Sequence, residues 1–170
     1  MHNVLLRTIN AIYLQCENVS RTGSDKDAAD FVNYCQTWAQ FVGEHHRAEE
    51  EEFFPAIEKM AGAPGVMGNN VEQHHAFHGG LEAFGEYLAA VQGGKEKFDG
   101  SKLKGIIDGF MPVLREHLSD EIDTLIGLEK FDDKVDWAKW MKEFQAAVLK
   151  KVSSDPKFKV CYRPTTLVSC

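Results

Sequence analysis

Histidines and glutamates occupy core-facing positions in four successive helical segments, and this feature most limits the folds open to the chain. Hydrophobic residues recur at steps of three and four along the sequence, and alternating β-branched runs are absent. This periodicity predicts helices at about residues 2–19, 26–60, 69–91 and 101–128, separated by glycine- or proline-containing breaks. Short connections between long helices favour an all-α fold, an up-down-up-down four-helix bundle.

A fifth amphipathic pattern follows the four long segments, at about residues 133–152, and carries Trp137, Trp140 and Phe144. The sequence is irregular from Ser153 onward. We therefore expect two parts. Residues 1–130 form the bundle, and residues 131–170 form an additional C-terminal helix and an irregular tail packed on the bundle.

The polar residues on the apolar stripes are all of types that bind metal ions. There are seven of them: His2, His45, Glu49, His74, His78, His117 and Glu121. An unpartnered buried carboxylate costs several kcal/mol, and a buried imidazole needs partners at both nitrogens. A single histidine or glutamate of this kind would be satisfied by hydrogen bonds to its neighbours in the core. Seven on facing helices are satisfied together by a shared metal centre.

The spacing of these residues supports convergence on one site. Three pairs are four residues apart, which places both members on the same helix face: His45 with Glu49, His74 with His78, and His117 with Glu121. Five imidazoles and two carboxylates exceed what one tetrahedral zinc site takes. They suit two ions of higher coordination number, with iron or manganese favoured and zinc or copper permitted.

Other polar residues near the stripes have weaker claims. His46 lies beside the seam with Glu50 one turn later, and we interpret the two as a supporting or surface pair. Glu72 and His75 form an ExxH motif, of which ferritin-like dimetal proteins use two. Only one is present, so the pattern does not favour that fold.

Four motifs together carry a family resemblance over about residues 2–128. They are His2-Asn3-Val4-Leu5-Leu6-Arg7, then His45-His46-Arg47-Ala48-Glu49-Glu50 leading to Phe54-Pro55, then Glu72-Gln73-His74-His75-Ala76-Phe77-His78, and finally His117-Leu118-Ser119-Asp120-Glu121. In this order and on core-facing seams, they resemble the hemerythrin-like proteins, the group of HHE cation-binding domains.

The resemblance implies a non-heme diiron centre with a defined ligand set. One iron would be bound by His74, His78 and His117. The other would be bound by His2 and His45 and would keep an open coordination position. In addition, Glu49 and Glu121 would bridge the two ions beside an oxo or hydroxo group. Dioxygen, another small diatomic or a peroxide would bind at the open position.

One departure from the oxygen carriers of that family separates the functional alternatives. Those carriers have an aspartate five residues after the histidine of the fourth helix, whereas this chain has Ile122 there and Glu121 one residue earlier. The change alters the length of the bridge. The first hypothesis is a protein that binds, stores or senses oxygen or iron. The second is a diiron oxidase, oxygenase or peroxidase acting on a small organic substrate, and the third is a structural zinc or mixed-metal bundle.

Charge and composition exclude several partners. The net charge of -7, with no basic stripe, argues against nucleic acid. No apolar run approaches the length that spans a membrane, and the N-terminus lacks a signal-peptide pattern, so we expect a cytoplasmic protein. The four cysteines make no CxxC pair and are expected to be free thiols. Nothing in the sequence specifies an oligomeric state.

Overall fold

The computed structural model describes residues 1–154, and every regular element in that range is helical. The elements are α1 (His2–Thr22), α2 (Asp25–Ala48), a π-helical segment (Glu49–Phe53), α3 (Phe54–Ala61), α4 (Gly68–Gln92), α5 (Gly100–Ile126), a 3-10 turn (Gly127–Phe131) and α6 (Trp137–Ser154).

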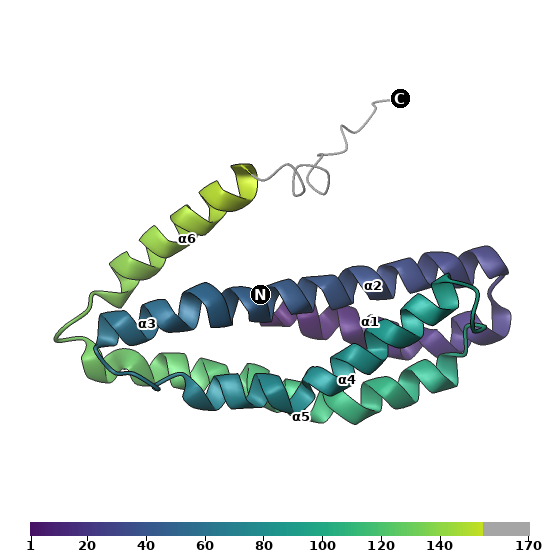
Figure 1. Cartoon of the computed structure of the whole chain (residues 1–170), viewed down its shortest axis with the longest axis horizontal. Helices are drawn as coiled ribbons and strands as arrows, with labels where there is room; N and C mark the ends of the chain where they lie inside the picture. The colour runs from purple at the N-terminus through teal and green to yellow at the C-terminus, as the bar shows by residue number, and fades with distance from the viewer. Residues whose placement is uncertain (155–170) are drawn as a thin grey trace. The chain divides into compact units, whose positions relative to one another are not determined.

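The predicted four-helix bundle is present within residues 1–128. Its four rods are α1, α2 continued by α3, α4 and α5, and Figure 1 shows their connections alternating between the two ends of the bundle. The first connection is short because Ser24 caps α2: its hydroxyl accepts from the Asp27 amide, and the Asp27 carboxylate accepts from the Ser24 amide. Sequence periodicity therefore specified this part of the fold correctly.

The bundle core is built from the apolar stripes of all four rods, with Ile12, Cys35, Phe84 and Ile107 almost fully buried. Five aromatic side chains are buried in the bundle: Trp38, Phe54, Phe77, Phe84 and Phe110. The Trp38 indole N–H donates to the Leu5 carbonyl at 3.0 Å, which ties α2 to α1. This apolar half fixes the register of the helices that carry the polar residues.

The second rod was predicted as one helix over residues 26–60 that Pro55 would kink or tighten, and in the structure it is divided near that proline. Its regular α-helix ends at Ala48, and the next turn is π-helical, with the Phe54 amide donating to the Glu49 carbonyl five residues back. Pro55 lies in the first turn of α3 and has no N–H to donate to the carbonyl four residues earlier. The wide turn accommodates that missing bond, and it begins at a predicted metal ligand.

Residues 129–154 belong to a separate compact unit, in which α6 places Trp137 edge-on to Trp140 and stacks Trp140 on Phe144. The predicted fifth helix is thus present. Its expected packing on the bundle stays a prediction. The predicted irregular tail lies, from residue 155 on, outside the described residues.

Two further expectations concern membranes and thiols. Among the described residues, none of the helices combines the length and the apolar character needed to cross a bilayer. Cys16 and Cys35 are buried free thiols, as expected, and burial raises the pKa of Cys35 to about 12. The other two cysteines lie outside the described residues.

The adjacent glycines Gly79 and Gly80 give a matched test of how closely α4 and α5 pack. A Cβ at Gly80 would lie 2.4 Å from the Phe110 Cβ, whereas a Cβ at Gly79 would meet no atom within 4 Å. We expect Gly80→Ala to lower the free energy of unfolding by about 1–3 kcal/mol through overpacking. By contrast, Gly79→Ala should raise it by about 0.5–1 kcal/mol through helix propensity. Chemical denaturation of both variants measures this, and equal effects would contradict the described packing.

Candidate metal centre

Metal-binding side chains from all four rods converge in the bundle interior. Their ligand atoms form two groups, each with all atoms within 4.8 Å of one another. The first group consists of His46, Glu49, His74 and His117, all of them buried, and the second consists of His2, His45 and Glu49. Because Glu49 belongs to both groups, the arrangement is that of two adjoining metal positions.

The two carboxylate oxygens of Glu49 face different histidines. Oε1 lies 3.1 Å from Nε2 of His45, and Oε2 lies 3.6 Å from Nε2 of His74. A carboxylate that presents one oxygen to each group has the geometry of a bridging ligand. Glu121 provides a second buried carboxylate beside the second group, with Oε2 2.8 Å from Nε2 of His2.

The outer nitrogens of three histidines are held by hydrogen bonds that fix the ring orientation. His2 Nδ1 donates to the Leu118 carbonyl at 3.0 Å, and His74 Nδ1 donates to the Glu50 carboxylate at 2.7 Å. His117 Nδ1 donates to the Gln73 side-chain oxygen at 3.3 Å. The Nε2 atoms of His74 and His117 therefore carry lone pairs directed into the cluster, as in metal-bound histidines whose other nitrogen is hydrogen-bonded.

Two of these lone pairs face each other directly, because Nε2 of His74 lies 3.0 Å from Nε2 of His117. Two unprotonated nitrogens at this distance repel each other unless a cation or a proton lies between them. A metal ion bound by both rings removes that repulsion.

Unpartnered polar atoms supply the clearest test of whether the residues fit a metal. Two buried atoms of the cluster, His46 Nε2 and Glu49 Oε2, have no partner at hydrogen-bond distance. A buried polar atom left without a partner costs about 1–3 kcal/mol, and more when it is charged. Both are of types that bind transition metals, so the residues present fit a metal centre.

Burial sets the protonation states of the cluster. It lowers the pKa of His45 and of His117 to about 4 and that of His46 to about 2. Burial, together with the nearby charge of Glu121, raises the pKa of Glu49 to about 9. Although burial alone would raise the pKa of Glu121, its hydrogen bond to His2 and the charge of that ring hold it below its usual value. Near neutral pH the imidazoles are thus ready to bind a metal, which has to displace a proton from Glu49.

His78 does not join the other predicted ligands. Its side chain is 67% exposed and its Nδ1 lies 3.5 Å from the Glu82 carboxylate. The reason lies in the step along α4, where the residue buried after His74 is Phe77, three positions on, and not His78, four positions on. The other six predicted ligands all lie in the cluster.

Two residues of this region were not predicted as part of the site. One is His46, 7% exposed, which reaches the cluster because the step from buried Val42 is four residues and not three. The sequence feature that could have indicated His46 is the tandem His45-His46, which precedes Pro55 and the change in helical pitch. The other is Asn70, one turn before His74, which is fully buried with both side-chain amide atoms unpartnered. Such a group requires a bound water or another ligand.

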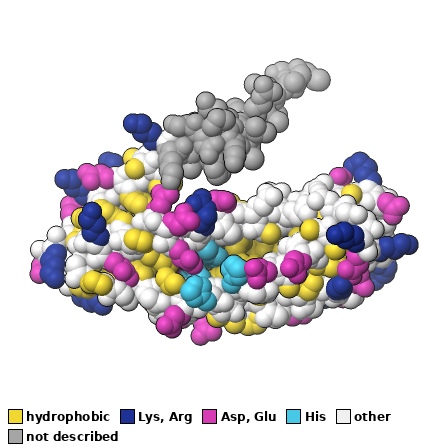
Figure 2. Space-filling model, viewed as in Figure 1, with side chains coloured by type: hydrophobic (Ala, Val, Ile, Leu, Met, Phe, Trp, Pro, Cys, Tyr) yellow, Lys and Arg dark blue, Asp and Glu magenta, His cyan; other side chains and the backbone are white. Residues whose placement is uncertain are grey.

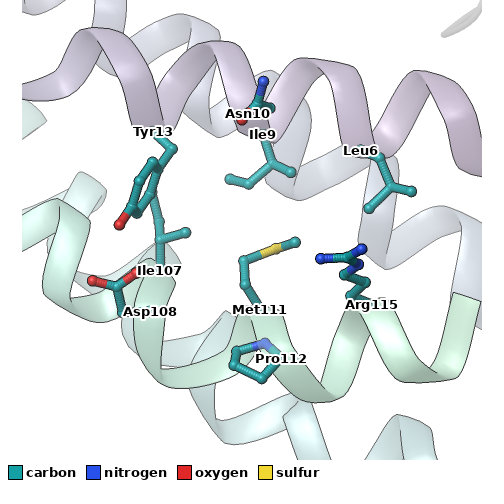
Figure 3. Close-up of a pocket in the computed structure, with 9 residues that line it drawn as sticks. All are labelled: Leu6, Ile9, Asn10, Tyr13, Ile107, Asp108, Met111, Pro112 and Arg115. Carbon is teal, nitrogen blue, oxygen red and sulfur yellow. The ribbon is translucent and has the colours of Figure 1, made fainter.

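One cavity reaches the cluster, and a second cavity does not. A pocket of about 420 Å³ is lined by His46 and His74 and by other residues of α2 and α4. Figure 2 shows histidine side chains reaching the surface beside acidic ones. A larger groove of about 580 Å³ runs between α1 and α5, with Ile9, Met111 and Arg115 along it (Figure 3). That groove has no member of either metal-ligand group in its lining.

The fold and the buried cluster define an all-α metal-binding bundle. The family model of the hemerythrin HHE cation binding domain matches residues 1–129, and the chain belongs to this family.

One curated relative adds a biosynthetic context. Over 142 residues the chain is 36% identical to the dimeric xanthone biosynthesis cluster protein R11 of Cryptosporiopsis sp. (strain 8999). The alignment covers 82% of this chain and 52% of that protein, so the chain spans about half the length of its relative. No solved structure matches.

The raised pKa of Glu49 predicts effects of opposite sign in the metal-free and metal-loaded protein. In the metal-free protein, stability is greatest below the unfolded-state pKa of this carboxyl and falls as pH rises toward about 9. We expect Glu49→Gln to raise the free energy of unfolding of metal-free protein at pH 8 by a few kcal/mol, on the order set by the pKa shift, with little effect near pH 4. The same variant should lower the stability of metal-loaded protein, because an amide is a poor bridge.

Denaturant titration of both forms at the two pH values measures this difference. The exposed Glu86→Gln variant is the control, since it removes the same charge from the surface of α4. A loss of stability in metal-free Glu49→Gln at pH 8 would contradict the assigned protonation state.

Proposed function

We propose that the protein binds two metal ions, iron in preference, and uses them to bind dioxygen or a related small oxidant such as a peroxide. The observation that carries this proposal is the division of the Glu49 carboxylate between two ligand groups. The proposed ligands combine the predicted residues that converge with the histidine that the structure adds: His2, His45, His46, Glu49, His74, His117 and Glu121.

The donor set supports iron as the metal. Five imidazoles and two carboxylates leave room for ions of five or six coordination, which iron and manganese accept, whereas structural zinc sites close with four ligands. Manganese or zinc are therefore substitutes of lower rank. Two iron ions supply an oxygen-binding position and two electrons, and the protein contributes buried, oriented ligands that keep water out.

A second candidate function is oxidation of a small organic substrate at the same centre. The pocket of about 420 Å³ that reaches His46 and His74 favours it, because an oxygen carrier needs no cavity of that size. The relative's name places that protein in a biosynthesis cluster, a context in which an oxidising enzyme is useful. Binding of oxygen is common to both candidates, and the fate of the bound oxygen separates them.

Replacement of two histidines tests the ligand set. We expect His46→Leu, which keeps the size of a buried side chain, to weaken iron binding by at least about tenfold. The exposed His78→Ala should leave iron binding unchanged. Metal analysis after anaerobic iron loading and dialysis measures both, with circular dichroism as the check on folding. The opposite result would be loss of one iron from His78→Ala while His46→Leu keeps two. It would favour the ligand set implied by the family resemblance, which contains His78.

The oxygen chemistry has its own test. We expect the iron-loaded, reduced protein to develop a new absorption band in the visible range when oxygen is added. A band that disappears on deoxygenation supports reversible binding, and irreversible oxidation supports an oxidase or a sensor. No spectral change with two irons bound would contradict oxygen binding while leaving the metal site intact.

A further inference from the structure

The pocket at the metal centre opens toward only one of the two ligand groups. Its lining includes His46 and His74 of the first group, and includes neither His2 nor His45 of the second. Any molecule that enters from this side therefore meets the position defined by His46, Glu49, His74 and His117. Nε2 of His46 is buried and unpartnered at that position.

The exposure of His78 matters for this position. That side chain lies at the mouth of the pocket and contacts Glu82, so it is not a donor at the cluster. Three imidazoles and one carboxylate leave coordination positions vacant on an ion that takes five or six donors. The pocket lies on the side of this position where His78, one turn after His74, supplies no second donor from α4.

The walls of the pocket are apolar where α2 and α4 face each other. Ala39 and Gly43, one turn apart on α2, contribute almost no side-chain volume, while Phe77 and Leu81 line it from α4. A Cβ at Gly43 would meet no atom within 4 Å, so the space beside it is empty. The volume of about 420 Å³ is within the range of small-molecule sites and far exceeds what a diatomic needs.

The rim of the pocket offers hydrogen-bond acceptors beside the imidazoles of His75 and His78. It carries the carboxylates of Glu50 and Glu82. Arg47 is the only lysine or arginine in the lining, and its guanidinium is engaged by Glu44 at 2.6 Å and Glu51 at 2.7 Å. An apolar slot with acceptors at its mouth suits an uncharged aromatic molecule that carries a hydroxyl donor.

We infer that the pocket between α2 and α4 binds a small neutral hydroxylated aromatic compound, a phenol, directly beside the metal position of His46, Glu49, His74 and His117. Its role as a substrate site rests on the proposed function. The pocket itself consists of protein residues and can be tested separately from the metal.

The test compares 2-naphthol with its anionic relative 2-naphthoate by isothermal titration calorimetry, using metal-free and iron-loaded protein under argon. In the metal-free protein, where no cation can attract the carboxylate, we expect saturable binding of 2-naphthol and at least about tenfold weaker binding of 2-naphthoate. In Gly43→Leu, which fills the slot, 2-naphthol binding should fall by at least about tenfold. Iron content and azide binding to the oxidised iron should be retained.

Two further variants make the result specific. Gly109→Leu on α5 is the matched control, because a Cβ there also meets no atom within 4 Å and the residue is absent from the pocket lining; it should bind both probes as the parent does. Glu82→Lys reverses one rim charge and should shift the preference toward 2-naphthoate. Helix propensity favours leucine over glycine, so both leucine variants should fold.

The outcomes separate this inference from the metal proposal. Two irons bound with no 2-naphthol binding, or equal effects of Gly43→Leu and Gly109→Leu, would overturn the pocket and leave the metal centre standing. Binding of 2-naphthol that depends on Gly43 and Glu82 in a protein that retains no iron would support the pocket and overturn the metal proposal.

Discussion

The repulsion between unprotonated imidazoles is the constraint on which the rest of this structure depends. His74 and His117 present their Nε2 atoms to each other at 3.0 Å because hydrogen bonds to Glu50 and Gln73 fix the opposite side of each ring. Without a cation or a shared proton, this arrangement is unfavourable in a buried environment. The unpartnered atoms of His46 and Glu49 add to the same cost. A cation held by this cluster would remove these unfavourable interactions.

The helices place all of these buried polar atoms, and hence their unfavourable free energy, at one level along the bundle axis. The apolar half, with Trp38 bonded to the Leu5 carbonyl and Gly80 packed against Phe110, sets the register of the rods. At the polar level the second rod changes pitch, and the π-helical turn starts at Glu49, the carboxylate shared by both groups. A change of pitch at a functional site is a recurrent use of π-helical geometry. Here it begins directly after α2, whose adjacent residues His45 and His46 both reach the cluster.

The sequence predicted the bundle and most of the cluster, and its errors have a single physical origin. Apolar periodicity identified all four rods and placed the stripes of α1 and α5 correctly, because those helices are regular through the site. On α2 and α4 the choice between a step of three and a step of four decides which histidine faces inward. Periodicity placed both His45 and His78 on the stripes. In the structure His45 lies in the cluster together with its neighbour His46, whereas His78 is exposed and Phe77 is the buried residue after His74. The pocket could not be predicted, because it depends on the absence of side-chain volume at Gly43 and on the outward turn of His78.

X-ray absorption spectroscopy of the iron-loaded protein tests the central claim, a dinuclear centre bridged by Glu49, most directly. The extended fine structure at the iron edge should show imidazole scattering and an iron–iron vector at about 3.5 Å, the separation typical of two-metal sites. In Glu49→Gln the iron–iron vector should weaken or disappear while imidazole scattering persists. An iron environment with imidazole ligands but no iron–iron vector in the parent protein would contradict the account, and would reduce the cluster to a mononuclear site.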